Sequence, residues 1–285
     1  MGHPLNYAFL AHRRSWLRRW PRLQILLREL YLRHMAWAIR LDDEMILCRI
    51  LGRYKLYADP SDRSISPHLI MQGYWEPRTT EVIIDLMRHG MTAIDVGANL
   101  GYFTIVMAAV GGTPGRVLAF EPNPGTAKRL RESLLLNGFQ TRVDLHEVVL
   151  GATDGEEVNL LLSVNHPGGT QVTSLTPDGP NFIKARTRRL DGVPGALDAA
   201  LVKIDAEGME EEIWRGMTAM IAGDRLRNVI VEFTPSSYKN APAMLDEAEA
   251  AGFRISSIDD ERGICSISRS DILHGAAQQM LIFQR

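Results

Sequence analysis

The 285-residue sequence contains only two cysteines, Cys48 and Cys265. They are too few and too far apart for a disulfide framework or a cysteine-ligated metal site. No apolar run approaches the roughly 20 residues that a helix needs to span a bilayer. A short apolar stretch at residues 5–11 is followed by arginines, not by the small residues of a signal-peptide cleavage site. These absences predict a cytoplasmic protein with buried, reduced thiols.

Acidic residues are nearly missing from residues 1–41, which hold eight arginines and Glu29 alone. This segment has a net charge of +7, so the remainder of the chain, whose total is −2, has a net charge of −9. Apolar side chains recur at steps of three and four residues from Trp16 to Leu41, as on one face of a helix. Because proline is tolerated only near a helix start, we expect a short first helix and a second that begins near Pro21.

This basic amphipathic extension is expected to pack on the rest of the chain or on a second copy in a homodimer. Contact with an anionic membrane is an alternative, which would place the protein peripherally at the inner membrane surface. We expect no nucleic acid as a partner.

A tight turn bounded by Gly97 and Gly101 joins an apolar run at residues 92–96 to a helical pattern. Glycine lets the backbone turn sharply and approach a ligand, and the helix N-terminus beyond it presents unpaired N–H groups. A second apolar run, residues 116–120, ends at Glu121, twenty-four residues after the first glycine. An acidic residue at this spacing accepts the hydroxyls of a ribose. The two strand ends therefore predict one nucleotide-like cofactor between them.

The turn reads Gly-x-Asn-x-Gly and lacks the Gly-x-Gly-x-x-Gly pattern that dinucleotides require. A Tyr-x-x-x-Lys pair is also missing from any suitable helix, which disfavours a dinucleotide-dependent oxidoreductase. The turn fits a loop around the amino-acid end of S-adenosylmethionine instead. A non-catalytic scaffold that binds this cofactor remains an alternative.

Four blocks resemble the FkbM-type S-adenosylmethionine-dependent methyltransferases, in the order of that family. They are Asp-Val-Gly-Ala-Asn-Leu-Gly-Tyr-Phe-Thr at 95–104, Phe-Glu-Pro-Asn-Pro at 120–124, Lys-Ile-Asp-Ala-Glu-Gly-Met-Glu at 203–210 and Val-Glu at 231–232. The resemblance implies methylation of a hydroxyl on a sugar, a glycan, a lipid-linked acceptor or a secondary metabolite. N-methylation of a small amine is the nearest alternative.

The same resemblance, with the turn itself, gives the residues expected to bind the cofactor. A Gly-Tyr-Glu-like element near residue 74, in which Trp75 is interposed, adds one more. The full set is Glu76, Asp95, Gly97, Ala98, Asn99, Gly101, Tyr102, Phe103, Glu121, Pro122 and Asp205.

Strands and helices alternate regularly after residue 80, which predicts an α/β fold with a doubly wound, Rossmann-like class I methyltransferase sheet at residues 80–285. Expected helices lie at 102–110, 125–137, 209–222 and 241–251. Seven strands are expected, the last one antiparallel, at 92–96, 116–121, 143–149, 200–205, 228–233, 253–258 and 280–283.

Residues 42–79 are expected to form a β-hairpin, from runs at 45–51 and 54–58, and a linker that leads to a helix near 78–89. Two further strands are expected at 155–162 and 185–190. Between them, residues 166–180 show no period and are rich in glycine and proline. A long irregular loop is usually functional, so we expect acceptor binding or a lid there.

Methyl transfer to an alcohol needs a base that removes the hydroxyl proton while the acceptor is held in line. Lys203 and Asp205 lie two residues apart at a strand end and therefore share one face. They are expected to act as an orienting cation and a base, with Glu207 close by. His166, the histidine of the irregular segment, is the alternative base. Asp205, Glu207 and Glu232 could gather a divalent cation, but we predict no metal.

Overall fold

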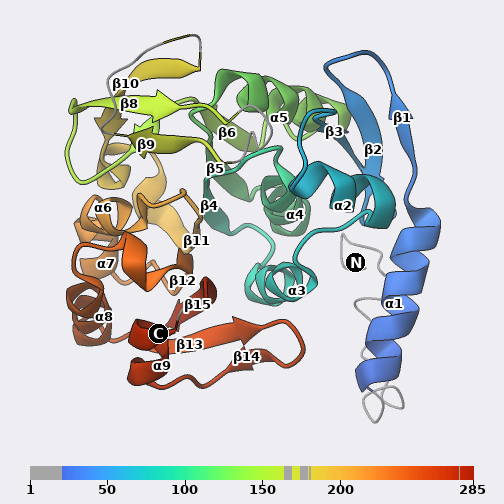
Figure 1. Ribbon diagram of the computed structural model, residues 1–285. Coiled ribbons are helices and arrows are strands. Elements are labelled where there is room, and N and C mark those ends of the chain that lie inside the picture. The colour runs from blue at the N-terminus through green and yellow to red at the C-terminus, as the bar shows by residue number, and fades with distance from the viewer. Residues whose placement is uncertain (1–20, 164–168, 174–178, 180, 276) are drawn as a thin grey trace.

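The computed structural model describes residues 21–163, 169–173, 179, 181–275 and 277–285 (Figure 1). Three sheets are present in this part of the chain, with eight, four and three strands. The eight-stranded sheet is the centre of the molecule, in the order β14-β13-β15-β12-β11-β4-β5-β6. Its strands are β4 (Thr92–Val96), β5 (Arg116–Phe120), β6 (Val143–His146), β11 (Ala199–Ile204), β12 (Asn228–Phe233), β13 (Arg254–Asp259), β14 (Gly263–Cys265) and β15 (Gln279–Gln284).

The order and directions of these strands confirm the expected fold class. Strands β6, β5, β4, β11 and β12 pair in parallel, and β15 pairs antiparallel with both β12 and β13. All seven expected strands are present. An eighth, β14, extends the sheet as a hairpin partner of β13 and was not expected, because three residues are too short to show an alternating pattern.

Helices cover both faces of the central sheet (Figure 1). One face carries α3 (Pro77–Leu86), α4 (Tyr102–Gly111) and α5 (Pro124–Leu136), and the other carries α6 (Glu210–Arg215), α7 (Thr218–Ala222) and α8 (Ala241–Ala250). Neighbouring residues of a strand point to opposite faces, so Ala93 and Leu201 join one core while Ile94 and Val202 join the other. This arrangement is the doubly wound architecture.

The expectation of a single helix at 209–222 is wrong, because two shorter helices, α6 and α7, form there. The carbonyl of Gly216 accepts the N–H of Asp191 and so leaves the helical ladder. The Asp191 carboxylate then accepts the N–H groups of Ala219 and Met220, which caps the second helix.

The N-terminal helix α1 (Pro21–Met35) lies at the edge of the molecule (Figure 1). The expected helix up to Leu41 is wrong, because β1 (Ala38–Arg40) pairs antiparallel with β2 (Ile46–Ile50), which forms the expected hairpin with β3 (Tyr54–Ala58). Strand pairing satisfies the backbone of β1 and overrides the helical period. Helix α2 (Ile65–Gln72) follows. No helix in the described residues is long and apolar enough to cross a membrane.

A four-stranded sheet, in the order β7-β10-β8-β9, lies beside the central sheet. Its strands are β7 (Val149–Leu150), β8 (Glu157–Leu161), β9 (Gln171–Thr173) and β10 (Phe182–Arg188). Strand β9 lies inside the segment that was expected to be irregular. His166 lies outside the described residues. A short helix, α9 (Arg269–His274), precedes the last strand.

Candidate active site

The glycine turn after β4 is pressed against the end of β11. Gly97 has a φ of +72°, and a Cβ atom there would lie 1.6 Å from the carbonyl oxygen of Asp205. Gly101 has a φ of +92°, and its Cβ would lie 2.1 Å from Leu130 Cδ1 on α5. Both positions therefore require glycine, for backbone conformation and for space.

Backbone donors of this turn bond within the protein. The N–H groups of Gly97 and Ala98 donate to the carbonyl of Phe120, at 3.0 and 2.9 Å. The N–H of Asn99, a residue at a positive φ of 51°, donates to Glu121 Oε2 at 2.8 Å. What the turn itself offers a ligand is close approach, because these donors are already engaged.

Glu121 joins the two strand ends that were expected to share a ligand. Its Oε1 atom accepts the N–H of Asn123 at 2.9 Å, and the residue is only 4% exposed. Burial raises the pKa of Glu121 to about 7, although the bonds from Asn123 and Asn99 oppose this shift. A carboxylate offers about four acceptor positions. Glu121 can therefore hold the turn and still accept hydroxyl groups.

Beside Glu121 lies a narrow apolar slot of about 50 Å³. It is lined by Pro122 and the end of β5, and by Leu160 and Val172 of the four-stranded sheet. Its other apolar walls are Val148, Val149, Leu150, Met209 and Ile213.

A second cavity, of about 280 Å³, lies on the other side of the turn. Gly97, Asp205 and Glu207 line both the slot and this cavity, so they form the wall between the two. We call this second cavity the acidic cavity, because it is lined by Lys203 and by four carboxyl groups, those of Glu76, Asp205, Glu207 and Glu232.

Lys203 is the cation at the centre of this group, with only 1% of its side chain exposed. Its Nζ lies 2.8 Å from Asp205 Oδ2 and 4.8 Å from the ring centroid of Phe103. Burial alone would lower the pKa of Lys203, but the carboxylates of Asp205, Asp95 and Glu76 raise it above its ordinary value. The ammonium is therefore held charged inside the fold.

Asp95 lies beneath the cavity, fully buried, and does not line it. Its Oδ2 accepts the hydroxyl of Thr104 at 2.6 Å. Its Oδ1 is buried without a hydrogen-bond partner among the described residues. Burial raises the pKa of Asp95, and Lys203 partly offsets that shift.

Glu76 precedes α3 in a left-handed conformation, with φ 38°. Its Oε2 is also buried and lacks a hydrogen-bond partner in the described part of the chain. Burial raises the pKa of Glu76, against the effect of Lys203. Tyr102 and Phe103, whose rings meet edge to face at 5.2 Å, line the same cavity.

Hydrogen bonds to the Glu210 carboxylate hold the turn after β11 in place. This carboxylate, 3% exposed, accepts the N–H of Ala206 at 2.8 Å and that of Gly208 at 3.1 Å. Glu207 occupies a positive φ of 51° in this turn. The turn therefore holds Asp205 and Glu207 at the mouth of the site.

Glu232, at the end of β12, was considered in the sequence only as a metal ligand. The parallel register Ile204↔Val231 brings it beside Asp205. No cluster of His, Cys, Asp and Glu side chains in the described residues has an arrangement that would hold a metal ion. The sequence signal for a role of Glu232 in the site was its position, as an acidic residue at the end of a core strand.

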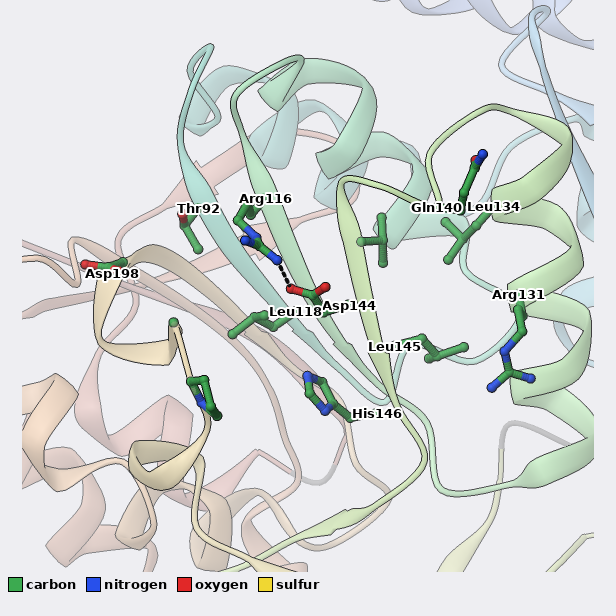
Figure 2. Close-up of a pocket in the computed structure, with 13 residues that line it drawn as sticks. Thr92, Arg116, Leu118, Arg131, Leu134, Gln140, Asp144, Leu145, His146 and Asp198 are labelled. Atoms are coloured by element: carbon green, nitrogen blue, oxygen red, sulfur yellow. Dashed lines mark hydrogen bonds and ion pairs between the residues drawn. The ribbon is translucent and has the colours of Figure 1, made fainter.

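A larger groove, of about 780 Å³, runs along β5 and β6 (Figure 2). It is lined by Thr92 and Arg116 at the amino ends of β4 and β5, and by β6 as far as His146 at its carboxyl end. Arg116 pairs with Asp144 of the neighbouring strand at 2.6 Å. None of the expected site residues lines it.

The Methyltransferase FkbM domain family matches residues 95–255. A relative, Methyltransferase 1 of Beauveria bassiana (strain ARSEF 2860), is 27% identical over 185 residues, or 57% of this chain and 72% of the relative.

Two solved methyltransferases have similar structures. The precorrin-6y C5,15-methyltransferase of Geobacter metallireducens GS-15 is 17% identical and has a TM-score of 0.41, with coverage of 76% of this chain and 92% of that one. A SAM-dependent O-methyltransferase of Thermotoga maritima is 16% identical and has a TM-score of 0.44, with coverage of 85% and 77%. The family match spans more than half of this chain and includes the glycine turn, Glu121 and the end of β11, so the protein belongs to the FkbM methyltransferase family.

Proposed function

We propose that the protein transfers the methyl group of S-adenosylmethionine to a hydroxyl of a sugar, a glycan, a lipid-linked acceptor or a secondary metabolite. The observation that carries this proposal is the common wall of Gly97, Asp205 and Glu207 between two unlike cavities. An apolar slot with a buried carboxylate suits a nucleoside. A charged cavity across the wall suits a polar acceptor and the amino-acid end of the cofactor.

The residues present fit this cofactor. Glu121 keeps acceptor positions for ribose hydroxyls, and the slot walls are apolar as a nucleobase requires. Glu76, which lines the cavity, has a buried acceptor without a partner in the described residues, Oε2, and an ammonium group would satisfy such an acceptor. The slot is narrow, so Leu160 and Val172 would have to move apart for a nucleobase to enter.

S-adenosylmethionine, when bound, supplies an electrophilic methyl group. The protein's own contribution would be to align an acceptor oxygen with that methyl and to exclude water. Lys203, fixed by Asp205 and by the ring of Phe103, would donate to the acceptor oxygen or to its neighbours. Asp205, as its bound partner, would keep the ammonium aimed at the cavity.

An amine acceptor is a second candidate, and the charge of the cavity favours it. Four carboxyl groups and one ammonium line it, and burial raises the pKa of two of them, Glu76 and Glu232, so a cationic amine that favours their ionised form would be attracted more strongly than a neutral alcohol. Competition between matched alcohol and amine acceptors in one assay would separate the two.

Calorimetry with S-adenosylmethionine, S-adenosylhomocysteine and NAD is the first test. We expect both sulfur nucleosides to bind and NAD not to bind. Labelled methyl transfer to a panel of hydroxylated acceptors then tests the reaction. NAD binding without any response to the methyl donor would contradict the proposal, and cofactor binding without turnover on any acceptor would support the scaffold alternative.

A further inference from the structure

Glu232 differs from the other charged groups of the acidic cavity in having no protein partner. Its carboxyl lines the cavity but makes no hydrogen bond or ion pair with any residue that the structure describes. Its main chain pairs with Met280 of β15, and its main-chain carbonyl also accepts the Tyr238 hydroxyl at 3.2 Å, but neither contact involves the carboxyl. A carboxyl that faces a cavity without a partner is available to a bound molecule.

Asp205 is much less available. Its Oδ2 is bound to the Lys203 ammonium at 2.8 Å. An acceptor hydroxyl could donate to this oxygen only by competing with the ammonium for it. The base that was expected at Asp205 is therefore better placed at its neighbour on β12.

We propose that Glu232 takes the proton from the acceptor as the methyl group is transferred. The inference rests on the proposed function. In the step, the acceptor oxygen forms a bond to the methyl carbon while the carbon–sulfur bond breaks and its electron pair stays on sulfur. Glu232 accepts the hydroxyl proton, so one positive and one negative charge disappear together and the products are an ether, a thioether and a neutral carboxyl.

The charges around Glu232 support this role. Burial and Asp205 raise the pKa of Glu232 to about 9, and Glu207 and Glu210 add to the effect while Lys203 opposes it. Glu76 lines the same cavity, and the Tyr238 hydroxyl bonds the main-chain carbonyl of Glu232. Glu232 therefore holds a proton more tightly than an ordinary carboxyl, and positive charge that enters the cavity would oppose this effect. A sulfonium beside it would release that proton, and loss of the sulfonium charge would favour retaining the proton taken from the acceptor.

The two cofactor forms provide a matched test without any acceptor, because S-adenosylmethionine carries a sulfonium and S-adenosylhomocysteine a neutral sulfur. Titration calorimetry at pH 7.5 in phosphate and in Tris measures the protons released on binding. We expect S-adenosylmethionine to release up to about one proton more per chain than S-adenosylhomocysteine. Glu232→Gln, which mimics the neutral carboxyl in size, should abolish this difference and still bind S-adenosylhomocysteine.

Glu207→Gln is the control, since it removes a different carboxylate from the same cavity. It should retain a difference in proton release between the two nucleosides. Equal proton release by both nucleosides in the unmodified protein, or a full difference in the Glu232→Gln variant, would overturn the inference. Failure of both nucleosides to bind the unmodified protein would instead refute the proposed function.

Discussion

The acidic cavity beside Lys203 and the groove along β5 and β6 differ in how their charges are compensated. In the groove, Arg116 meets Asp144 with both side chains about half exposed. In the acidic cavity, Lys203 is buried among carboxyl groups. A buried oxygen of Glu76, and one of Asp95 beneath the cavity, lack hydrogen-bond partners in the described residues.

The groove is the larger of the two, at about 780 Å³ against about 280 Å³. Its ion pair between Arg116 and Asp144 is nevertheless exposed to solvent, where such a pair contributes little. Uncompensated charge in a buried site is costly unless a ligand completes it. The acidic cavity is therefore the better candidate for the active site. Variants on both sides test whether the cavity and the groove differ in this way.

Lys203→Ala should have the largest effect. It leaves the buried carboxylate of Asp95 and the partly buried one of Asp205 without their cation, so we expect the free energy of unfolding to fall by about 3–5 kcal/mol. Turnover should fall by about 10²–10⁴-fold where the variant remains folded. Urea unfolding and single-turnover methyl transfer measure the two effects. Lys239→Ala removes an exposed ion pair with Glu212 and should change neither.

Glu121→Gln should change the pH dependence of stability. Because the folded-state pKa of Glu121 is raised from 4.5 to about 7, the folded protein holds a proton that the unfolded chain has lost. This stabilisation is complete below pH 4.5 and disappears as the pH rises to about 7, with a total of about 3 kcal/mol. Unfolding curves at several pH values should show a shallower decline in the variant. An identical decline would place the titrating group elsewhere.

Gly97→Ala should weaken cofactor binding about tenfold or more, because strain at φ +72° and a contact with Asp205 would displace the turn. Gly195→Ala is matched to it. Gly195 has a φ of +86° and lines the groove, but a Cβ atom added there would have no other atom within 4 Å among the described residues. Calorimetry should show normal cofactor binding in this control. Equal binding losses in both variants would mean that strain acts through general stability.

Arg116→Ala should have the smallest effect. The ion pair with Asp144 is exposed, so the free energy of unfolding should change by less than about 1 kcal/mol. Cofactor binding, measured by calorimetry, should be unchanged. A marked loss of cofactor binding would show that the groove affects the active site, and the groove and the acidic cavity would then not be independent.

Local patterns predicted the parts of the site that depend on short stretches of chain. The strand, turn and helix around Gly97 form one continuous segment, and Glu121 follows its own strand directly. Parallel strands place their carboxyl ends at one edge, so their meeting could be inferred as well. The helix expected up to Leu41 failed because β2, a separate segment, pairs with β1 and withdraws those residues from the helix.

The sequence by itself determined the seven expected strands of the central sheet, the glycine turn and the family, because each depends on neighbouring residues. The pair of Lys203 and Asp205 also followed from the sequence, because residues two apart share one face of a strand. Only the tertiary structure decided that Glu232 lies beside them, since the register between β11 and β12 sets it next to Asp205. These segments are separated by more than 20 residues, and no local pattern records that the Glu232 carboxyl has no partner among the described residues.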